Sequence, residues 1–133
     1  MLGLFGKKKS AKTLKIGLLT PGQPMVEKSF EDGEKITIGT GPGNSLVLKS
    51  KLLPKKFILF RPEDDRYLLH FLPEMDGKVA INDAAMTFQL LKQKGIVETT
   101  KGQHTISISN KTRGKIVFEN YRILFRFDDA GTK

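Results

Sequence analysis

The sequence predicts an all-β fold, an antiparallel β-sandwich of about ten short strands with one short helix or helical turn. Short runs of alternating apolar and polar residues recur along the chain, as expected of half-buried strands. Clusters of Gly, Pro, Asn and Asp separate these runs, and no long helical patterns alternate with them, which disfavours a doubly wound α/β nucleotide fold. A barrel is the alternative β architecture. With 133 residues, the chain is long enough for one domain.

The N-terminal part of the chain is expected to form three strands followed by two loops. Each strand is marked by recurring apolar residues, and the three lie at residues 14–18, 25–30 and 36–38. A glycine-rich loop at residues 40–45, a β-like run at 46–48 and a basic loop at 49–56 follow. Two neighbouring loops of this kind are expected to share one end of a sandwich.

The C-terminal part of the chain is expected to continue as a meander of hairpins around one helical segment. Its predicted strands are residues 57–60, 67–71, 78–81, 104–108, 115–119 and 121–127. Met86, Leu90 and Lys94 are at helical spacing and Gly95 suits a C-cap, so residues 86–95 predict the short helix. The aromatic residues of the strands are expected to fill the core rather than to stack on nucleic-acid bases: Phe57, Phe60, Tyr67, Phe71, Phe118, Phe125 and Phe127.

Positive charge is concentrated at the start of the chain. The formal net charge is +9, and the first fifteen residues hold no acid but five lysines: Lys7, Lys8, Lys9, Lys12 and Lys15. We predict a flexible basic leader at residues 1–12, a folded domain at 13–127 and a polar tail at 128–133. The leader is expected to attract an anionic membrane surface or another anionic partner. The chain has no cysteine and no recognisable export signal, so we expect a cytoplasmic location, including peripheral association at the inner membrane.

The pattern of polar residues disfavours catalysis, metal binding and cofactor binding. His70 and His104 lie in separate strands without ligand spacing, so ordinary half-exposed histidines are expected. The acidic pairs at residues 64–65 and 128–129 fall in a turn and a tail, which favours a solubilising role. The glycines at residues 39–43 lack the Gly-Lys-Ser/Thr of a Walker loop and precede a β-like run. We therefore expect a protein that is not an enzyme, with no cofactor and no metal site.

Four segments of the chain together resemble a forkhead-associated (FHA) domain: residues 36–39, 44–48, 75–77 and 114–127. The likeness spans residues 13–127 and is nearest to divergent FHA-like domains at the N-terminus of deltaproteobacterial envelope and gliding-motility proteins. Those domains share a Met-Asp-Gly turn, which is present at residues 75–77, and a Leu-Pro-x-x-Phe-x-Leu-Phe pattern, which is present at residues 53–60. The resemblance implies an FHA-like β-sandwich that mediates protein–protein interaction as part of a bacterial signalling scaffold.

The residues that bind phosphate in an FHA domain are altered in this chain. Phosphothreonine-reading members carry an arginine after the third strand, a Ser-x-x-His segment in the next loop and a later Asn-Gly turn. Thr40 stands at the position of the arginine, and Pro54 and Lys56 fall in the region of the serine-to-histidine segment. Asp76 replaces the asparagine before Gly77. Threonine lacks the fork of donors that arginine offers, and aspartate repels a phosphate dianion, so the resemblance implies a degenerate phosphothreonine site.

The predicted function is therefore non-catalytic binding of a protein partner through the loop end of the sandwich. An acidic or phosphorylated partner is expected, because lysines steer acidic partners and glycines allow close approach of a backbone. The candidate partner-binding residues are Thr40, Gly41, Asn44, Ser45, Lys49, Ser50, Lys51, Lys55, Lys56, Asp76 and Gly77. Two alternatives stay open. One is a phosphopeptide-binding FHA domain, and the other is a basic binder of anionic membranes or, less favoured, of nucleic acid, acting through Lys7, Lys8, Lys9, Lys12 and Lys15.

Overall fold

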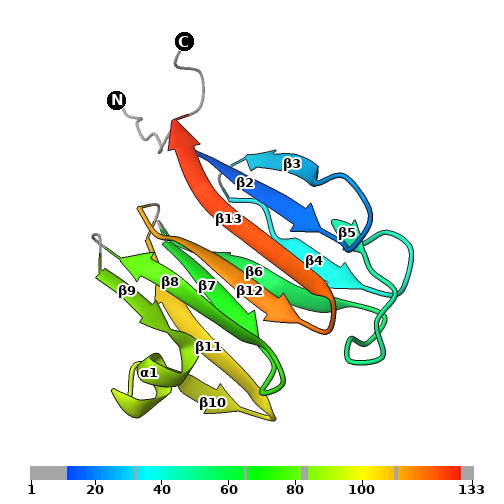
Figure 1. The fold of residues 1–133 in the computed structure, drawn as a ribbon. Coiled ribbons are helices and arrows are strands. Elements are labelled where there is room, and N and C mark those ends of the chain that lie inside the picture. Colours follow the sequence, from blue (N-terminus) through cyan, green and yellow to red (C-terminus); the bar gives the residue numbers. More distant parts are fainter. Residues whose placement is uncertain (1–11, 32, 65, 82–83, 110, 130–133) are drawn as a thin grey trace.

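The computed structural model describes residues 12–31, 33–64, 66–81, 84–109 and 111–129 (Figure 1). The predicted leader therefore lies almost entirely outside the described residues, as do residues 130–133 of the predicted tail. Lys7, Lys8, Lys9 and the side chain of Lys12 belong to that part of the chain. No helix among the described residues is long and apolar enough to span a membrane.

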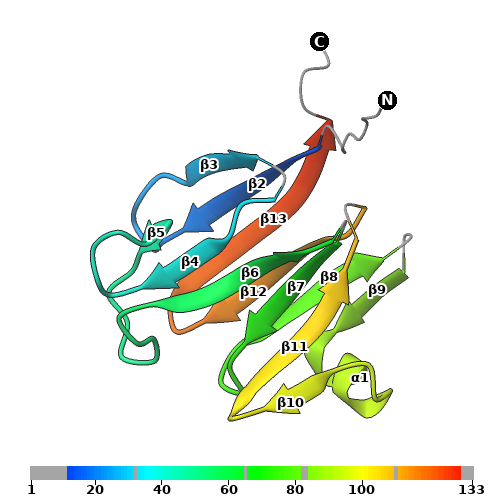
Figure 2. The same cartoon turned by 180° about the vertical axis from the view of Figure 1, so that it is seen from behind.

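Two six-stranded sheets pack face to face, so the predicted all-β sandwich is confirmed. The β13 sheet has the order β3-β2-β13-β12-β8-β9, with bounds Val26–Glu31, Lys12–Leu19, Tyr121–Asp129, Arg113–Phe118, Asp76–Ile81 and Ala84–Thr87. The β6 sheet, which lies toward the viewer in Figure 2, has the order β10-β11-β7-β6-β4-β5, with bounds Glu98–Thr100, Gln103–Ile108, Arg66–Phe71, Phe57–Glu63, Ile36–Gly39 and Leu46–Val47.

The described part of the chain thus holds twelve strands rather than about ten. The two that the sequence did not predict, β9 and β10, are edge strands, each paired on one side. All three residues of β10 are exposed, and so are three of the four in β9. Strands that bury so little carry no apolar alternation, which is the signal that sequence analysis depends on.

The pairing of β4 with β5 corrects the expected succession of antiparallel hairpins, because it is parallel. Ile38 lies opposite Leu46, and Gly39 lies opposite Val47. The chain leaves β4, loops through residues 40–45 and returns to run in the same direction beside it. Side-chain bonds hold this return, since the Thr37 N–H donates to Ser45 Oγ at 3.0 Å and the Ser45 N–H donates to Thr37 Oγ1 at 3.2 Å.

The expected helix is present as α1, Phe88–Gln93, but it starts later and buries a different face. Thr87 is the N-cap, and its side chain accepts a hydrogen bond from the Leu90 N–H at 3.1 Å. Met86 therefore belongs to β9, and Phe88 and Leu91 are the buried helix residues. Gly95, with a φ of 73°, follows the helix end as expected.

Aromatic side chains from both sheets meet in the core. The rings of Phe60 in β6 and Phe125 in β13 are 5.0 Å apart at an interplanar angle of 68°, an edge-to-face contact. Phe71 in β7 stacks on Phe88 at 4.0 Å, which joins α1 to the β6 sheet. The predicted aromatic core is confirmed, with Phe127 partly buried and the other six residues buried: Phe57, Phe60, Tyr67, Phe71, Phe118 and Phe125.

Replacing Phe60 by alanine should lower the free energy of unfolding by about 3–5 kcal/mol, because it removes a fully buried ring and leaves a cavity between the sheets. Urea unfolding followed by circular dichroism measures this change. Val47→Ala is the matched control, since Val47 is 56% exposed and its loss should change stability by less than about 0.5 kcal/mol. Equal losses in the two variants would contradict this description of the core.

Candidate functional site

Two consecutive loops of the β6 sheet, residues 40–45 and 48–56, lie side by side as expected. The Thr40 N–H donates to the Pro54 carbonyl at 3.2 Å, and the Gly41 N–H donates to the Lys55 carbonyl at 3.0 Å. The Asn44 side-chain amide donates from Nδ2 to the carbonyl oxygens of both Gly41, at 2.7 Å, and Lys55, at 2.8 Å. The loops therefore form one hydrogen-bonded unit at this end of the sandwich.

The turn between β12 and β13 in the other sheet contacts the second of these loops. Glu119 Oε2 accepts a hydrogen bond from the Lys51 N–H at 3.2 Å. The Tyr121 hydroxyl donates to the Lys49 carbonyl at 2.7 Å. Glu119 has a φ of 51°, a left-handed conformation that tightens this turn. Both sheets therefore contribute to the same end of the molecule.

A groove of about 850 Å³ opens between these segments, and we call it the loop-end groove. Four of the predicted partner-binding residues line it, namely Thr40, Lys49, Ser50 and Lys51. The remaining lining residues were not predicted: Thr20, Pro21, Glu119, Asn120 and Tyr121. The sequence offered one signal for these residues, the Glu-Asn pair at positions 119–120, which indicates a hairpin turn. It does not indicate which loop that turn faces.

The other predicted residues of the two loops lie outside the lining of this groove. Gly41, Asn44 and Lys55 take part in hydrogen bonds between the loops, and the Ser45 side chain is hydrogen-bonded to Thr37. Lys56 is exposed. Asn44 and Ser45 thus hold the loop conformation, and Lys55 and Lys56 present charge beside it.

Asp76 and Gly77 do not line the loop-end groove. Both lie in β8, where Asp76 is paired with Val117 and Gly77 with Ile116 of β12. A Cβ atom at Gly77 would lie 2.3 Å from the Lys115 carbonyl oxygen and 2.8 Å from the Phe88 ring. This glycine therefore permits close packing of β8 against β12 and α1.

Lys15, which the sequence analysis grouped with the leader lysines, belongs to the described part of the chain. It lies within β2, opposite Arg126 of β13, and its Nζ is 3.8 Å from Asp128 Oδ2. Part of the charge of Lys15 is therefore neutralised within the folded domain.

His70 corrects the expectation of a half-exposed side chain, because only 6% of its surface is exposed. Two side chains of the neighbouring strand β11 contact it, with Thr105 Oγ1 at 2.8 Å and Gln103 Nε2 at 3.1 Å from His70 Nδ1. Burial, and to a smaller extent the positive charge of Arg61, lower the pKa of His70. His104 is partly exposed, and among the described residues no group of His, Cys, Asp and Glu side chains is placed to hold a metal ion.

No protein-family model matches this chain, and no curated protein matches it. A search of solved structures finds similarity to the FHA domain of the CT664 protein from Chlamydia trachomatis. The two chains are 14% identical, and the match covers 86% of this chain and 96% of the other, with a TM-score of 0.47.

Replacing Asn44 by alanine should lower the free energy of unfolding by about 1–3 kcal/mol, because it leaves the carbonyl groups of Gly41 and Lys55 without a side-chain donor. Chemical unfolding provides the measurement. Lys56→Ala is the control in the same loop pair, with an expected change below about 0.5 kcal/mol. An Asn44 variant as stable as this control would mean that the amide does not hold the loops together.

Proposed function

We propose that this chain is a non-catalytic protein-interaction module of the FHA type, which binds its partner through the loop-end groove and without phosphothreonine recognition. The sequence resemblance and the β-sandwich support the module type. The position of Glu119 supports the proposed absence of phosphothreonine recognition. The sequence-based predictions of a cytoplasmic location and of leader binding to an anionic membrane accompany it as separate proposals.

The Glu119 carboxylate lines the loop-end groove. It already accepts the Lys51 N–H, which removes one backbone donor of the second loop. A phosphate dianion in the groove would meet this carboxylate as a like charge. No arginine is among the groove-lining residues, and Thr40 occupies the edge where the FHA arginine is expected. These features support a groove that disfavours phosphate.

The same groove offers contacts for an unmodified peptide segment. Lys49 and Lys51 are exposed at its wall, so single carboxylates of a partner have cations to approach. The side chains of Pro21 and Tyr121 add apolar surface, and the Tyr121 hydroxyl is already satisfied by Lys49. Because the loops are held by hydrogen bonds, little conformational entropy is lost when they bind. A partner with acidic and apolar side chains fits these properties.

Phosphorylation of a peptide should not strengthen its binding to this chain. In a titration with a pool of phosphothreonine peptides and with its unphosphorylated twin, we expect similar affinities for the two pools. The Glu119→Gln variant keeps an oxygen acceptor for the Lys51 N–H but removes the charge, so it should shift the preference toward the phosphorylated pool. Micromolar binding of wild type that requires phosphate, about 8 kcal/mol of binding free energy, would contradict the proposal.

Loop lysines should contribute to partner binding with little effect on folding. Peptides selected on the wild-type chain from a display library should bind less tightly after Lys49 and Lys51, or Lys55 and Lys56, are replaced by alanine. The stability of each variant should change by less than about 0.5 kcal/mol, which thermal unfolding can check. Lys111→Ala is the control, because Lys111 precedes β12 at the opposite end of that strand from Glu119. Unchanged affinity in both double variants would place the partner surface elsewhere.

A further inference from the structure

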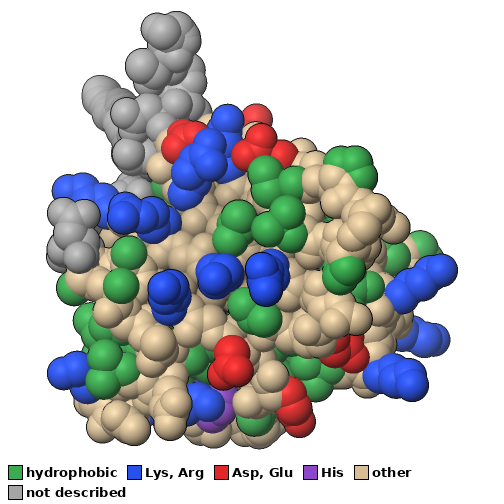
Figure 3. All heavy atoms as spheres, in the orientation of Figure 1, with side chains coloured by type: hydrophobic (Ala, Val, Ile, Leu, Met, Phe, Trp, Pro, Cys, Tyr) green, Lys and Arg blue, Asp and Glu red, His purple; other side chains and the backbone are tan. Residues whose placement is uncertain are grey.

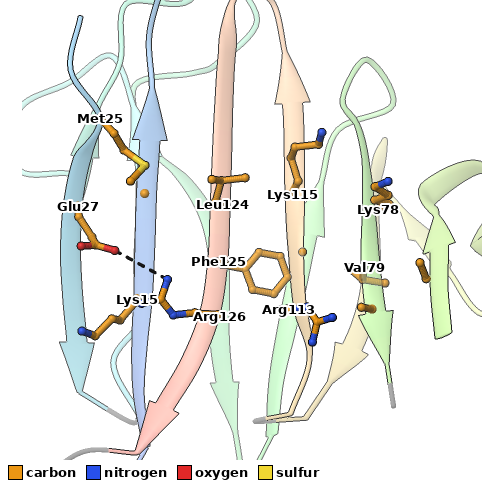
Figure 4. Close-up of a pocket in the computed structure, with 14 residues that line it drawn as sticks. Lys15, Met25, Glu27, Lys78, Val79, Arg113, Lys115, Leu124, Phe125 and Arg126 are labelled. Atoms are coloured by element: carbon orange, nitrogen blue, oxygen red, sulfur yellow. Dashed lines mark ion pairs between the residues drawn. The ribbon is translucent and has the colours of Figure 1, made fainter. Parts of the chain in front are cut away.

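The outer face of the β13 sheet carries a second groove that shares no lining residue with the loop-end groove. It has a volume of about 400 Å³ and spans the sheet from Met25 beside β3 to Ala85 in β9. Figure 3 shows Lys and Arg side chains gathered across this face, and Figure 4 shows those that border the groove. The groove-lining cations are Lys15, Lys78, Arg113, Lys115 and Arg126, and Glu27 is the acid that lines it. We call this feature the sheet-face groove.

Strand register places like charges directly opposite one another on this face. Lys115 of β12 is the partner of Lys78 of β8, and Arg126 of β13 is the partner of Lys15 of β2. Side chains opposite one another in an antiparallel pair are neighbours, with Cβ atoms about 4.5–5.5 Å apart, and like charges there are destabilising. Electrostatic repulsion is therefore expected within both of these pairs.

Acidic side chains among the described residues offset the repulsion between Lys15 and Arg126 but not that between Lys78 and Lys115. Arg126 Nε is 3.2 Å from Asp128 Oδ1, and Arg126 Nη1 is 4.0 Å from Glu27 Oε2. Within the described part of the chain, Lys78, Lys115 and Arg113 form no ion pair. These three neighbouring cations thus have no acidic partner among the described residues, and departures of this kind from local rules are expected at functional sites.

The floor between these cations and β3 is apolar. Leu124 lies opposite Lys115 on one side and Gly17 on the other. Gly17 lets the Met25 side chain pack onto β2, because a Cβ atom there would lie 2.9 Å from Met25 Sδ. Met25 is 47% exposed at this wall, and Figure 4 shows its side chain directed toward β2. Cations without an ion pair among the described residues therefore border a recess that suits an apolar side chain.

We propose that the sheet-face groove is a second interaction surface, which binds an acidic polypeptide segment that places an apolar side chain between its carboxylates. Charge complementarity selects an acidic occupant. A second copy of this chain would bring cations against cations, since the net charge is +9. A bilayer surface does not fill a recess. Bases would lack an exposed ring to stack on, because Phe125, which is the aromatic side chain in the lining, is 3% exposed.

A short fluorescent peptide with one leucine flanked by glutamates on both sides tests the proposal on the full chain. We expect fluorescence anisotropy to show tighter binding of this peptide than of the same peptide with serine in place of leucine. Lys78→Glu with Lys115→Glu should weaken its binding by about tenfold or more, as expected when close charge pairs are lost. Lys94→Glu with Lys101→Glu makes the same change in net charge at exposed positions that line neither groove, and should leave binding nearly unchanged. Lys78 and Lys115 do not line the loop-end groove, so a loss of binding in their variant tests the sheet-face groove separately from the proposed function.

The single variant Lys115→Glu separates binding from folding. It places an acid opposite Lys78, so we expect a higher melting temperature together with weaker peptide binding. A lower melting temperature would contradict the repulsion inferred for this pair. Equal binding of the leucine and serine peptides, equal losses in the two double variants, or a larger loss of binding to anionic vesicles or a DNA oligonucleotide than to the peptide in the Lys78→Glu with Lys115→Glu variant would each overturn the proposal.

Discussion

The contact between Phe60 and Phe125 is the interaction on which the rest of the structure depends. Phe60 belongs to an inner strand of the β6 sheet and Phe125 to an inner strand of the β13 sheet, so their contact fixes one sheet against the other. Gly114, opposite Phe125, leaves room for it, since a Cβ atom there would lie 2.8 Å from the Phe125 ring. The loop-end groove needs this packing because Thr40 comes from one sheet and Glu119 from the other.

Both proposed surfaces suit acidic partners, but they differ in the anions that they disfavour. In the loop-end groove, the Glu119 carboxylate occupies a donor and opposes highly charged anions. On the sheet face, Lys78 and Lys115 oppose each other and have no acid among the described residues to relieve them. Repulsion by Glu119 therefore disfavours highly charged anions at the loop-end groove. Repulsion between Lys78 and Lys115 favours an acidic partner at the sheet-face groove.

Sequence reasoning succeeded wherever burial follows a simple period. Alternating apolar residues such as Leu14 and Ile16 marked the buried strands, and Gly95 marked the helix end. Edge strands β9 and β10 left no such pattern, and the parallel return into β5 depends on side-chain bonds that no period encodes. The candidate site was predicted only in part, because sequence position indicates some of its contacts and not others. Adjacent loops can be read as neighbours, whereas Glu119 is 68 positions from Lys51, and only the folded chain brings them together.

The pairing of β2 with β13 has a consequence for the order in which the chain can fold. These strands lie at residues 12–19 and 121–129, so β2 gains its central partner only after nearly all of the described chain has been synthesised. Every strand of the β6 sheet lies between residues 36 and 108 and can pair earlier. On a ribosome, the β6 sheet would therefore form while its apolar face is still uncovered. Long-range pairing of this kind slows folding and leaves the nascent chain open to aggregation until β13 emerges.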